Sequence, residues 1–262
     1  MLPNERLQSN RFELKYLISP RQALAVRDFV RSLLTLDPYM NPAQPDGYMV
    51  YSAYVDSPTL MLCRATVDGE KNRYKLRVRF YDDNPDHPVF FEIKRRVNDA
   101  ILKSRATVRR DRAMELLRGR GPRETDLVNP RDTRGFAALG NFCLLRDKLT
   151  ARPAALVAYR REAYMSTGDN SARLTLDREL CGAEWTDQFG ELSGERWRPV
   201  PIEHVILELK FTQRFPLWMG ELVRRLDLQR ISMPKYVECI SALREPRFSP
   251  AGRIGRLAVA PA

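Results

Sequence analysis

The stretch RFELKYLI, residues 11–18, alternates charged and large apolar side chains along its whole length. As a β-strand it places Arg11, Glu13 and Lys15 on one face, and Phe, Leu and Tyr side chains on the other. Such a strand can lie at a surface, with its charges in water. It can also line the inside of a closed sheet. The fold therefore depends on whether the charged face meets bulk water or the interior of the protein.

The chain is long enough for one large domain, with 262 residues of which 44% are hydrophobic. We expect a single domain over residues 1–245 and a loose, Pro- and Gly-punctuated tail over residues 246–262. No apolar run approaches the ~20 residues of a membrane helix, and the first residues contain no apolar signal segment. The expected location is the cytoplasm, with attachment to the inner face of a membrane as an alternative.

The charged residues give a formal net charge of +11. This charge indicates either a polyanionic partner or a basic, soluble surface, and only the positions of the charges can decide. The cysteines are scattered and the chain has only 2 histidines, which argues against a disulfide framework and against a zinc site. Any metal would then be a hard cation held by carboxylates and by the substrate.

Helical patterns occur between the strand-like stretches. Ser19, Pro20 and Gln22 predict a capping box with proline at the first helical position, followed by an apolar stripe. Further helices are predicted within residues 111–119, 132–150, 216–228 and 234–244.

The alternation of RFELKYLI recurs in other stretches, so that about eight strands are predicted. In RYKLRVRFY, for example, basic residues alternate with Leu, Val and Phe. The polar side chains that share one face of a predicted strand are Lys75, Arg77, Arg79, Glu92, Lys94, Lys103, Arg105, Tyr159, Arg161, Arg173 and Glu208. Each of these strands also offers an apolar face.

Helices need apolar surface to pack on, so they should cover the apolar faces of the sheet. In an open sheet the charged faces would meet water. Eight strands closed into a barrel would instead leave room inside for one small ligand. Unpaired cations in a dry interior cost several kcal/mol each, so a basic lumen must be wet and hold anions such as phosphates. The expected fold is therefore α+β, an eight-stranded antiparallel β-barrel with a charged lumen and helices packed on the outside.

Acidic residues on these strands occur in a repeated Glu-x-Lys pattern. One such pair alone is typical of an ordinary ion pair on one face of a strand. Three pairs among strands that all carry basic residues indicate a site, because carboxylates together with phosphate oxygens are what Mg²⁺ or Mn²⁺ prefers. The pairs are Glu13 with Lys15, Glu92 with Lys94, and Glu208 with Lys210.

Taken together and in order, these stretches resemble the VTC domain, which is similar to the CYTH and triphosphate tunnel metalloenzyme group. The resemblance covers about residues 10–243 and includes RFELKYLI, YSAYVDS, RYKLRVRFY, VFFEIKRR, AYRREAY, ARLTLDREL, VILELKF and SMPKYVECI. It implies an eight-stranded tunnel, a divalent metal (Mn²⁺ or Mg²⁺) and a substrate that carries a triphosphate. VTC domains are polyphosphate polymerases, which transfer the γ-phosphate of ATP to a growing polyphosphate chain.

The resemblance also implies roles for individual residues, by their match to the motif positions of the family. The implied catalytic residues are Arg77, Arg79, Lys94, Arg161, Arg173 and Lys235. The implied phosphate-binding residues are Lys15, Arg64, Lys75, Lys103, Arg105 and Tyr159. Glu208 is the implied metal ligand, with Glu13 and Glu92 as further candidates.

The expected partners are ATP or another triphosphate and inorganic polyphosphate, and the sequence leaves open whether a membrane protein is also needed. A triphosphatase or polyphosphatase that uses water in the same tunnel is one alternative, and a non-catalytic polyphosphate-binding module is another. Duplex nucleic acid is not expected, because the charges alternate along strands and do not line one helix. A Walker-type nucleotide loop is absent from the sequence.

Overall fold

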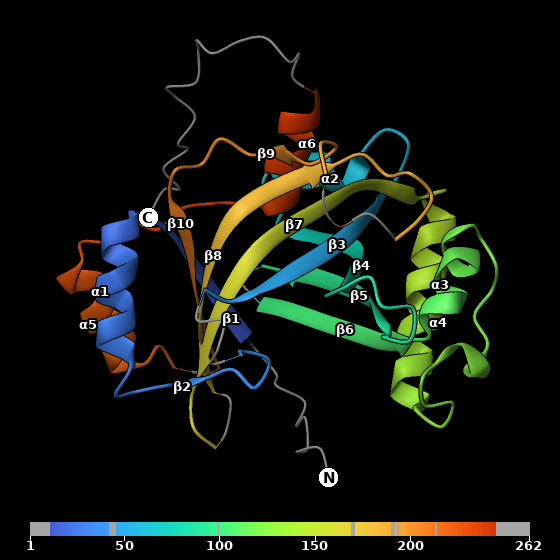
Figure 1. Cartoon of the computed structure of the whole chain (residues 1–262). Coiled ribbons are helices and arrows are strands. Elements are labelled where there is room, and N and C mark those ends of the chain that lie inside the picture. Colours follow the sequence, from blue (N-terminus) through green and yellow to red (C-terminus); the bar gives the residue numbers. More distant parts are fainter. Residues whose placement is uncertain are drawn as a thin grey trace.

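The computed structural model describes residues 11–41, 46–98, 100–168, 171–189, 192, 194–212 and 214–244 (Figure 1). Its strands are β1 (Arg11–Ile18), β2 (Thr35–Leu36), β3 (Tyr48–Asp56), β4 (Asn72–Phe80), β5 (Val89–Val97), β6 (Ala100–Val108), β7 (Arg152–Met165), β8 (Ala172–Ala183), β9 (Arg198–Pro199) and β10 (Val205–Thr212). Its α-helices are α1 (Pro20–Val30), α2 (Met61–Val67), α3 (Arg110–Leu117), α4 (Thr133–Lys148), α5 (Leu217–Arg225) and α6 (Lys235–Arg244). The predicted tail, residues 246–262, lies outside the described residues.

The strands form one 10-stranded antiparallel sheet in the order β2-β7-β3-β4-β5-β6-β1-β10-β8-β9, and β7 also pairs with β8. The predicted eight strands are the long ones. Strands β2 and β9 were not predicted, because two residues are too few to show an alternation. The predicted closed barrel is not confirmed: β1 is paired with β10 from Arg11 to Ile18, but its ladder with β6 contains one residue pair, Arg11 with Ile101.

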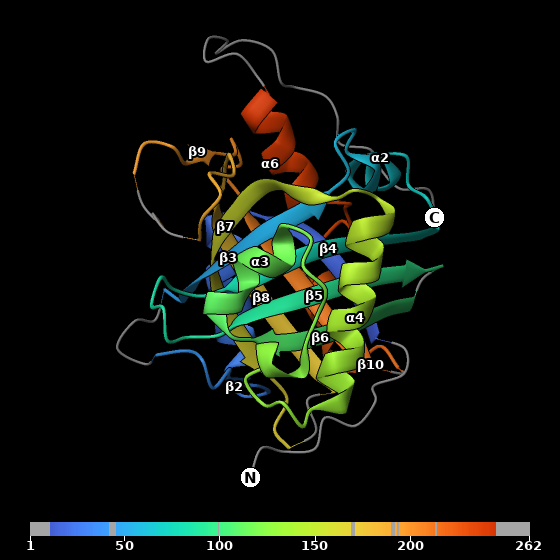
Figure 2. The same ribbon diagram turned by 90° about the vertical axis from the view of Figure 1, so that its right-hand side faces the viewer.

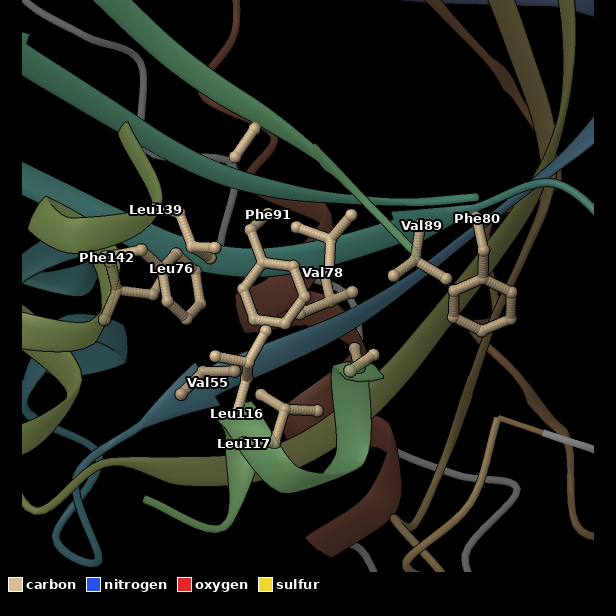
Figure 3. Packing of buried hydrophobic residues seen from close by; sticks show 14 of the residues in the cluster. Val55, Leu76, Val78, Phe80, Val89, Phe91, Leu116, Leu117, Leu139 and Phe142 are labelled. Atoms are coloured by element: carbon tan, nitrogen blue, oxygen red, sulfur yellow. The ribbon is translucent and has the colours of Figure 1, made fainter. Parts of the chain in front are cut away.

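Helices cover the apolar face of the sheet on two sides, as predicted (Figures 1 and 2). Helices α1 and α5 pack on β1, β8 and β10, where Tyr16 and Leu207 are buried. Helices α3 and α4 pack on β4, β5 and β6. There the ring of Phe142 meets that of Phe91 edge-on at 4.9 Å (Figure 3). Complete burial of such a side chain stabilises the fold by roughly 1.5–3 kcal/mol, so these contacts hold the helices firmly on this apolar face.

Helix α1 begins at the predicted capping box. The Gln22 amide donates to the Ser19 hydroxyl at 3.2 Å, and the Gln22 side chain accepts from the Ser19 amide at 2.9 Å. The helix is also fixed to the sheet by an ion pair, in which the Arg27 guanidinium donates to both carboxylate oxygens of the buried Glu162 at 2.7 and 2.8 Å. Glu162 follows Arg161 on β7 and therefore points to the opposite face.

Helices α2 and α6 meet at one end of the sheet, near the carboxyl end of β3 (Figure 1). The buried carboxylate of Asp56 accepts from the amides of Leu62 and Cys63 in α2 and from the hydroxyl of Tyr236 in α6. The ring of Tyr236 stacks on that of Tyr54 at 4.4 Å. These contacts fix the amino-terminal end of α6, and so they determine where Lys235 lies.

Gly47, the residue before β3, lies against the backbone of β7. Its φ of +100° is a backbone conformation that favours glycine, and a Cβ atom there would overlap the carbonyl group of Arg161. Glycine at this position therefore allows the strand pairing that places Arg161.

We predict that Gly47→Ala destabilises the protein more than Gly119→Ala does. Both positions have positive φ, which costs a residue with a side chain about 1–2 kcal/mol, but a Cβ atom at Gly119 would meet open space. Only Gly47→Ala should also separate β3 from β7. Urea unfolding of the two variants measures the difference, and equal losses of stability would show that the close approach is unimportant.

Candidate functional site

The face of the sheet turned away from α1, α3, α4 and α5 carries a connected set of charged side chains, which we call the basic inner face. It includes Glu13 and Lys15 of the first predicted strand, whose apolar neighbours pack on the helices as expected. Together with Lys235 of α6, its ionisable members are Glu13, Lys15, Lys75, Arg77, Arg79, Glu92, Lys94, Lys103, Arg105, Arg161, Arg173, Asp177, Glu208 and Lys210. Cations clearly outnumber carboxylates in this set.

Glu92 organises one part of the basic inner face. Its side chain is 0% exposed, and it accepts from Arg77 at 2.7 and 2.8 Å, from Arg105 at 2.6 and 2.7 Å and from Lys103 at 2.8 Å. Burial alone would raise the pKa of Glu92, but Arg77 and Lys103 hold it well below its ordinary value. One carboxylate thus orients three cations from β4 and β6.

Asp177 and Glu208 organise the part nearest α6. Arg161 donates to both oxygens of Asp177 at 2.7 Å, and the ammonium of Lys235 lies 2.7 Å from Asp177 and 2.7 Å from Glu208. Although burial opposes it, the two carboxylates raise the pKa of Lys235 above its ordinary value. Arg161 and Lys235 therefore remain charged and fixed in position.

Glu13 joins Lys94 of β5 to the part of the inner face around Glu208. Its carboxylate lies 2.8 Å from the ammonium of Lys94 and 3.5 Å from that of Lys15, and Lys15 lies 3.4 Å from Glu208. Lys210 also contacts Glu208, and burial lowers the pKa of Lys210 to about 7 despite this contact. The ion pairs of the inner face therefore form a network in which each carboxylate contacts at least two cations.

Two basic residues of the inner face have no carboxylate partner among the described residues. Arg79 is only 6% exposed, and its guanidinium donates to the hydroxyls of Tyr159 at 3.2 Å and Ser52 at 3.4 Å. Lys75 makes neither an ion pair nor a side-chain hydrogen bond within the described part of the chain. A buried cation without a counter-ion is costly, so Arg79 indicates a place for an anion, and the half-buried Lys75 lies on the same strand face.

The remaining predicted residues lie at different places. The ring of Tyr159 is inside the network, with the Lys235 ammonium at 4.9 Å and the Arg161 guanidinium at 5.1 Å from its centroid. Arg173 lies at the edge of the network and forms a 2.6 Å ion pair with Asp37. Arg64 does not join the network, because α2 presents its side chain to solvent.

Several members of the site were not predicted as site residues. Asp177 lies on the same strand face as Arg173 in ARLTLDREL, and Lys210 belongs to the third Glu-x-Lys pair. The alternation that indicates Arg173 and Glu208 therefore also includes Asp177 and Lys210. Tyr54, whose hydroxyl accepts from Arg77 at 3.3 Å, lies on a strand without alternating charges. Asp37 follows a two-residue strand, and no feature of the sequence indicates its contact with Arg173.

The predicted metal ligands were Glu208, Glu13 and Glu92. In the described part of the chain, no group of three or more His, Cys, Asp and Glu side chains is arranged to hold a metal ion. Glu13 and Glu208 both contact Lys15, but Glu13 is also paired with Lys94, and Glu208 with Arg161, Lys210 and Lys235. These hard oxygen donors fit Mg²⁺ or Mn²⁺ when phosphate oxygens complete the coordination. Cations also occupy the oxygens of Glu92, so a metal ion would have to displace cations from any of the three carboxylates.

The geometry defines a class of domain, an antiparallel sheet whose inner face is buried, net positive and suited to an anion. The model of the VTC domain family matches residues 10–244. The chain therefore belongs to the VTC domain family, which confirms the resemblance predicted from its sequence.

Comparison with solved structures finds a "putative adenylate cyclase" from Vibrio parahaemolyticus, 15% identical, with a TM-score of 0.43 over 89% of this chain and 98% of that chain. No match was found among curated proteins. Within the residues described by the structure, we find no helix with the length and apolar character needed to cross a membrane.

We predict that binding of tripolyphosphate takes up protons above neutral pH. Burial lowers the pKa of Lys75 well below its ordinary value, and the charges of Lys15 and Lys94 lower it further. A bound anion favours the charged ammonium and raises this pKa again, so Lys75 gains a proton at a pH between the two values. Calorimetric titrations at a series of pH values from neutral up to the ordinary pKa of lysine, each in two buffers of different ionisation enthalpy, measure the uptake.

The Lys75→Met variant should take up less proton than the wild type, and Lys148→Met should behave like the wild type, because Lys148 is exposed at the end of α4. Equal uptake by wild type and Lys75→Met would show that Lys75 does not meet the anion.

Proposed function

We propose that this protein is a polyphosphate polymerase, which transfers the γ-phosphate of ATP to a growing inorganic polyphosphate chain on the basic inner face. The observation that supports this most directly is Arg79, a buried guanidinium with hydroxyl partners and no carboxylate among the described residues. It lies among oriented cations, which suits a substrate with several adjacent negative charges. Membership of the VTC domain family agrees with this function.

A tunnel is part of the proposal. The long strands pair in the series β7-β3-β4-β5-β6-β1-β10-β8, and β8 pairs again with β7. The single residue pair between β1 and β6 is the one loosely joined position in that series. We infer that the sheet curves far enough to surround the basic inner face, and that the phosphate chain lies inside it.

The reaction would need positioning and charge neutralisation more than covalent catalysis, as in other phosphoryl transfers. Arg77, Arg79 and Lys94 would hold the triphosphate. Glu92 and Glu13 fix two of these side chains in advance, so little reorganisation remains when the substrate binds.

Arg161, Arg173 and Lys235 would stabilise the phosphoryl group during transfer. Asp177 holds Arg161 and Lys235 in place. The terminal phosphate of the acceptor chain is already ionised near neutral pH, so the reaction requires no general base. Glu208 and Glu13 would hold a divalent Mn²⁺ or Mg²⁺ ion, which neutralises phosphate charge when it is bound.

The test is incubation of the purified protein with ATP and Mn²⁺, followed by electrophoresis of the products. We predict a ladder of polyphosphate chains for the wild type and a loss of activity of about 100-fold or more for Arg79→Met. Arg31→Met is the matched control, because Arg31 is 76% exposed at the end of α1 and should retain full activity.

Other outcomes of this experiment distinguish the polymerase from the alternative functions. Orthophosphate without a ladder would contradict synthesis and support a triphosphatase or polyphosphatase. Tight binding of polyphosphate without turnover would support a non-catalytic binding module. Full activity of Arg79→Met would contradict the site itself.

A further inference from the structure

An aromatic cluster lies at one end of strands β3, β4 and β5, and we call it the aromatic rim. It consists of Tyr39 after β2, Tyr48 at the start of β3, Tyr81 after β4 and Phe90 near the start of β5. Tyr39 and Tyr81 are stacked with ring centroids 6.4 Å apart and planes at 6°. Tyr81 also meets Tyr48 edge-on at 6.0 Å and Phe90 edge-on at 5.9 Å.

The aromatic rim differs from the buried aromatic residues of the inner face. Tyr54 and Tyr159 are buried and hydrogen-bonded to arginines. Tyr39, in contrast, is 78% exposed. The other rings of the aromatic rim are half-buried, so a flat ligand can reach this cluster from solvent. A stacked pair of rings with one exposed member offers a π-face to such a ligand.

The aromatic rim is continuous with the basic inner face. The guanidinium of Arg105 lies 4.5 Å from the ring centroid of Phe90, and the same guanidinium donates to Glu92. Burial raises the pKa of the Tyr48 hydroxyl to about 12, although the nearby charges of Arg161 and Arg173 lower this pKa. Cations of the phosphate site thus border the aromatic rings directly.

Asp37 fixes the segment that carries Tyr39. Its carboxylate binds Arg173 at 2.6 Å and accepts from the amide of Tyr39 at 2.9 Å. Its own amide donates to the carbonyl of Ala163 on β7. The position of the exposed ring is therefore set by the inner face and by the sheet.

We propose that the aromatic rim is the subsite for the nucleobase of the triphosphate donor. The base would stack on Tyr39 and Tyr81, and the phosphates would extend from Arg105 toward Arg79. This inference rests on the proposed function, since it names the part of the site that meets the nucleoside. Stacking tolerates different bases because every base has a π-face, so the subsite should accept both adenine and guanine.

The test compares the affinity for ATP with that for tripolyphosphate, which has phosphates but no base. Calorimetry without turnover, in the absence of divalent metal, gives both dissociation constants for the wild type, Tyr39→Ala and Tyr39→Phe. We expect Tyr39→Ala to weaken ATP binding at least about fivefold and to leave tripolyphosphate binding within twofold. Tyr39→Phe keeps the ring and should bind ATP like the wild type.

Fluorescence of ethenoadenosine triphosphate provides a second readout, because stacking on an aromatic ring quenches it. Quenching by the wild type and by Tyr39→Phe, with less quenching by Tyr39→Ala, supports the subsite. If Tyr39→Ala weakens the binding of ATP and of tripolyphosphate equally, or changes neither, the nucleobase subsite is overturned. The proposed phosphate site is not contradicted by either result. A wild type that fails to bind tripolyphosphate overturns the proposed function, and this inference with it.

Discussion

The structure depends on one electrostatic constraint, the need to hold many buried cations close together on the basic inner face. Isolated buried charges cost several kcal/mol each, so such a face requires internal counter-ions, bound anions or both. Glu92 alone contacts Arg77, Lys103 and Arg105, and Glu208 contacts Lys15, Lys210 and Lys235. These carboxylates reduce repulsion without removing the excess of positive charge, and the remaining excess suits the binding of a polyanion.

The same constraint explains the arrangement of the layers. Because the charged side chains take one face of most of the long strands, the apolar side chains of these strands pack on the other face. Helices α1 and α5 on one side, and α3 and α4 on the other, supply that cover. Among the described helices, α6 reaches the inner face through Lys235, and the contacts of Tyr236 with Asp56 and Tyr54 hold it there. Most of the apolar core therefore lies between the sheet and its helices, on the side away from the basic inner face.

The alternation of side chains was sufficient to predict most of the site. A period of two places Glu13, Lys15, Arg77, Arg79 and Lys94 on one face of their strands regardless of the tertiary fold. The capping box at Ser19 was predictable for a similar reason, since it involves only neighbouring residues. Local patterns of this kind remain visible in the sequence because they do not depend on distant contacts.

The features that the sequence did not reveal depend on tertiary geometry. Arg64 lies on a helix, where alternation gives no guidance, and it points to solvent. The contact of Asp37 with Arg173 joins a loop to a strand more than a hundred residues away. The limited pairing of β1 with β6 depends on the register between the two strands. The alternation of side chains along one strand contains no information about that register. Closure of a sheet and the positions of loop residues therefore required the structure.

The central claim is that a phosphate chain binds on the basic inner face, and a crystal structure with bound tripolyphosphate and Mn²⁺ tests it most directly. The account predicts phosphate oxygens in contact with Arg77, Arg79 and Lys94, and Lys75 drawn toward the anion. Phosphates bound only to exposed arginines on the outer helices, with the ion pairs of Glu92 and Glu13 unchanged and no anion beside Arg79, would contradict it.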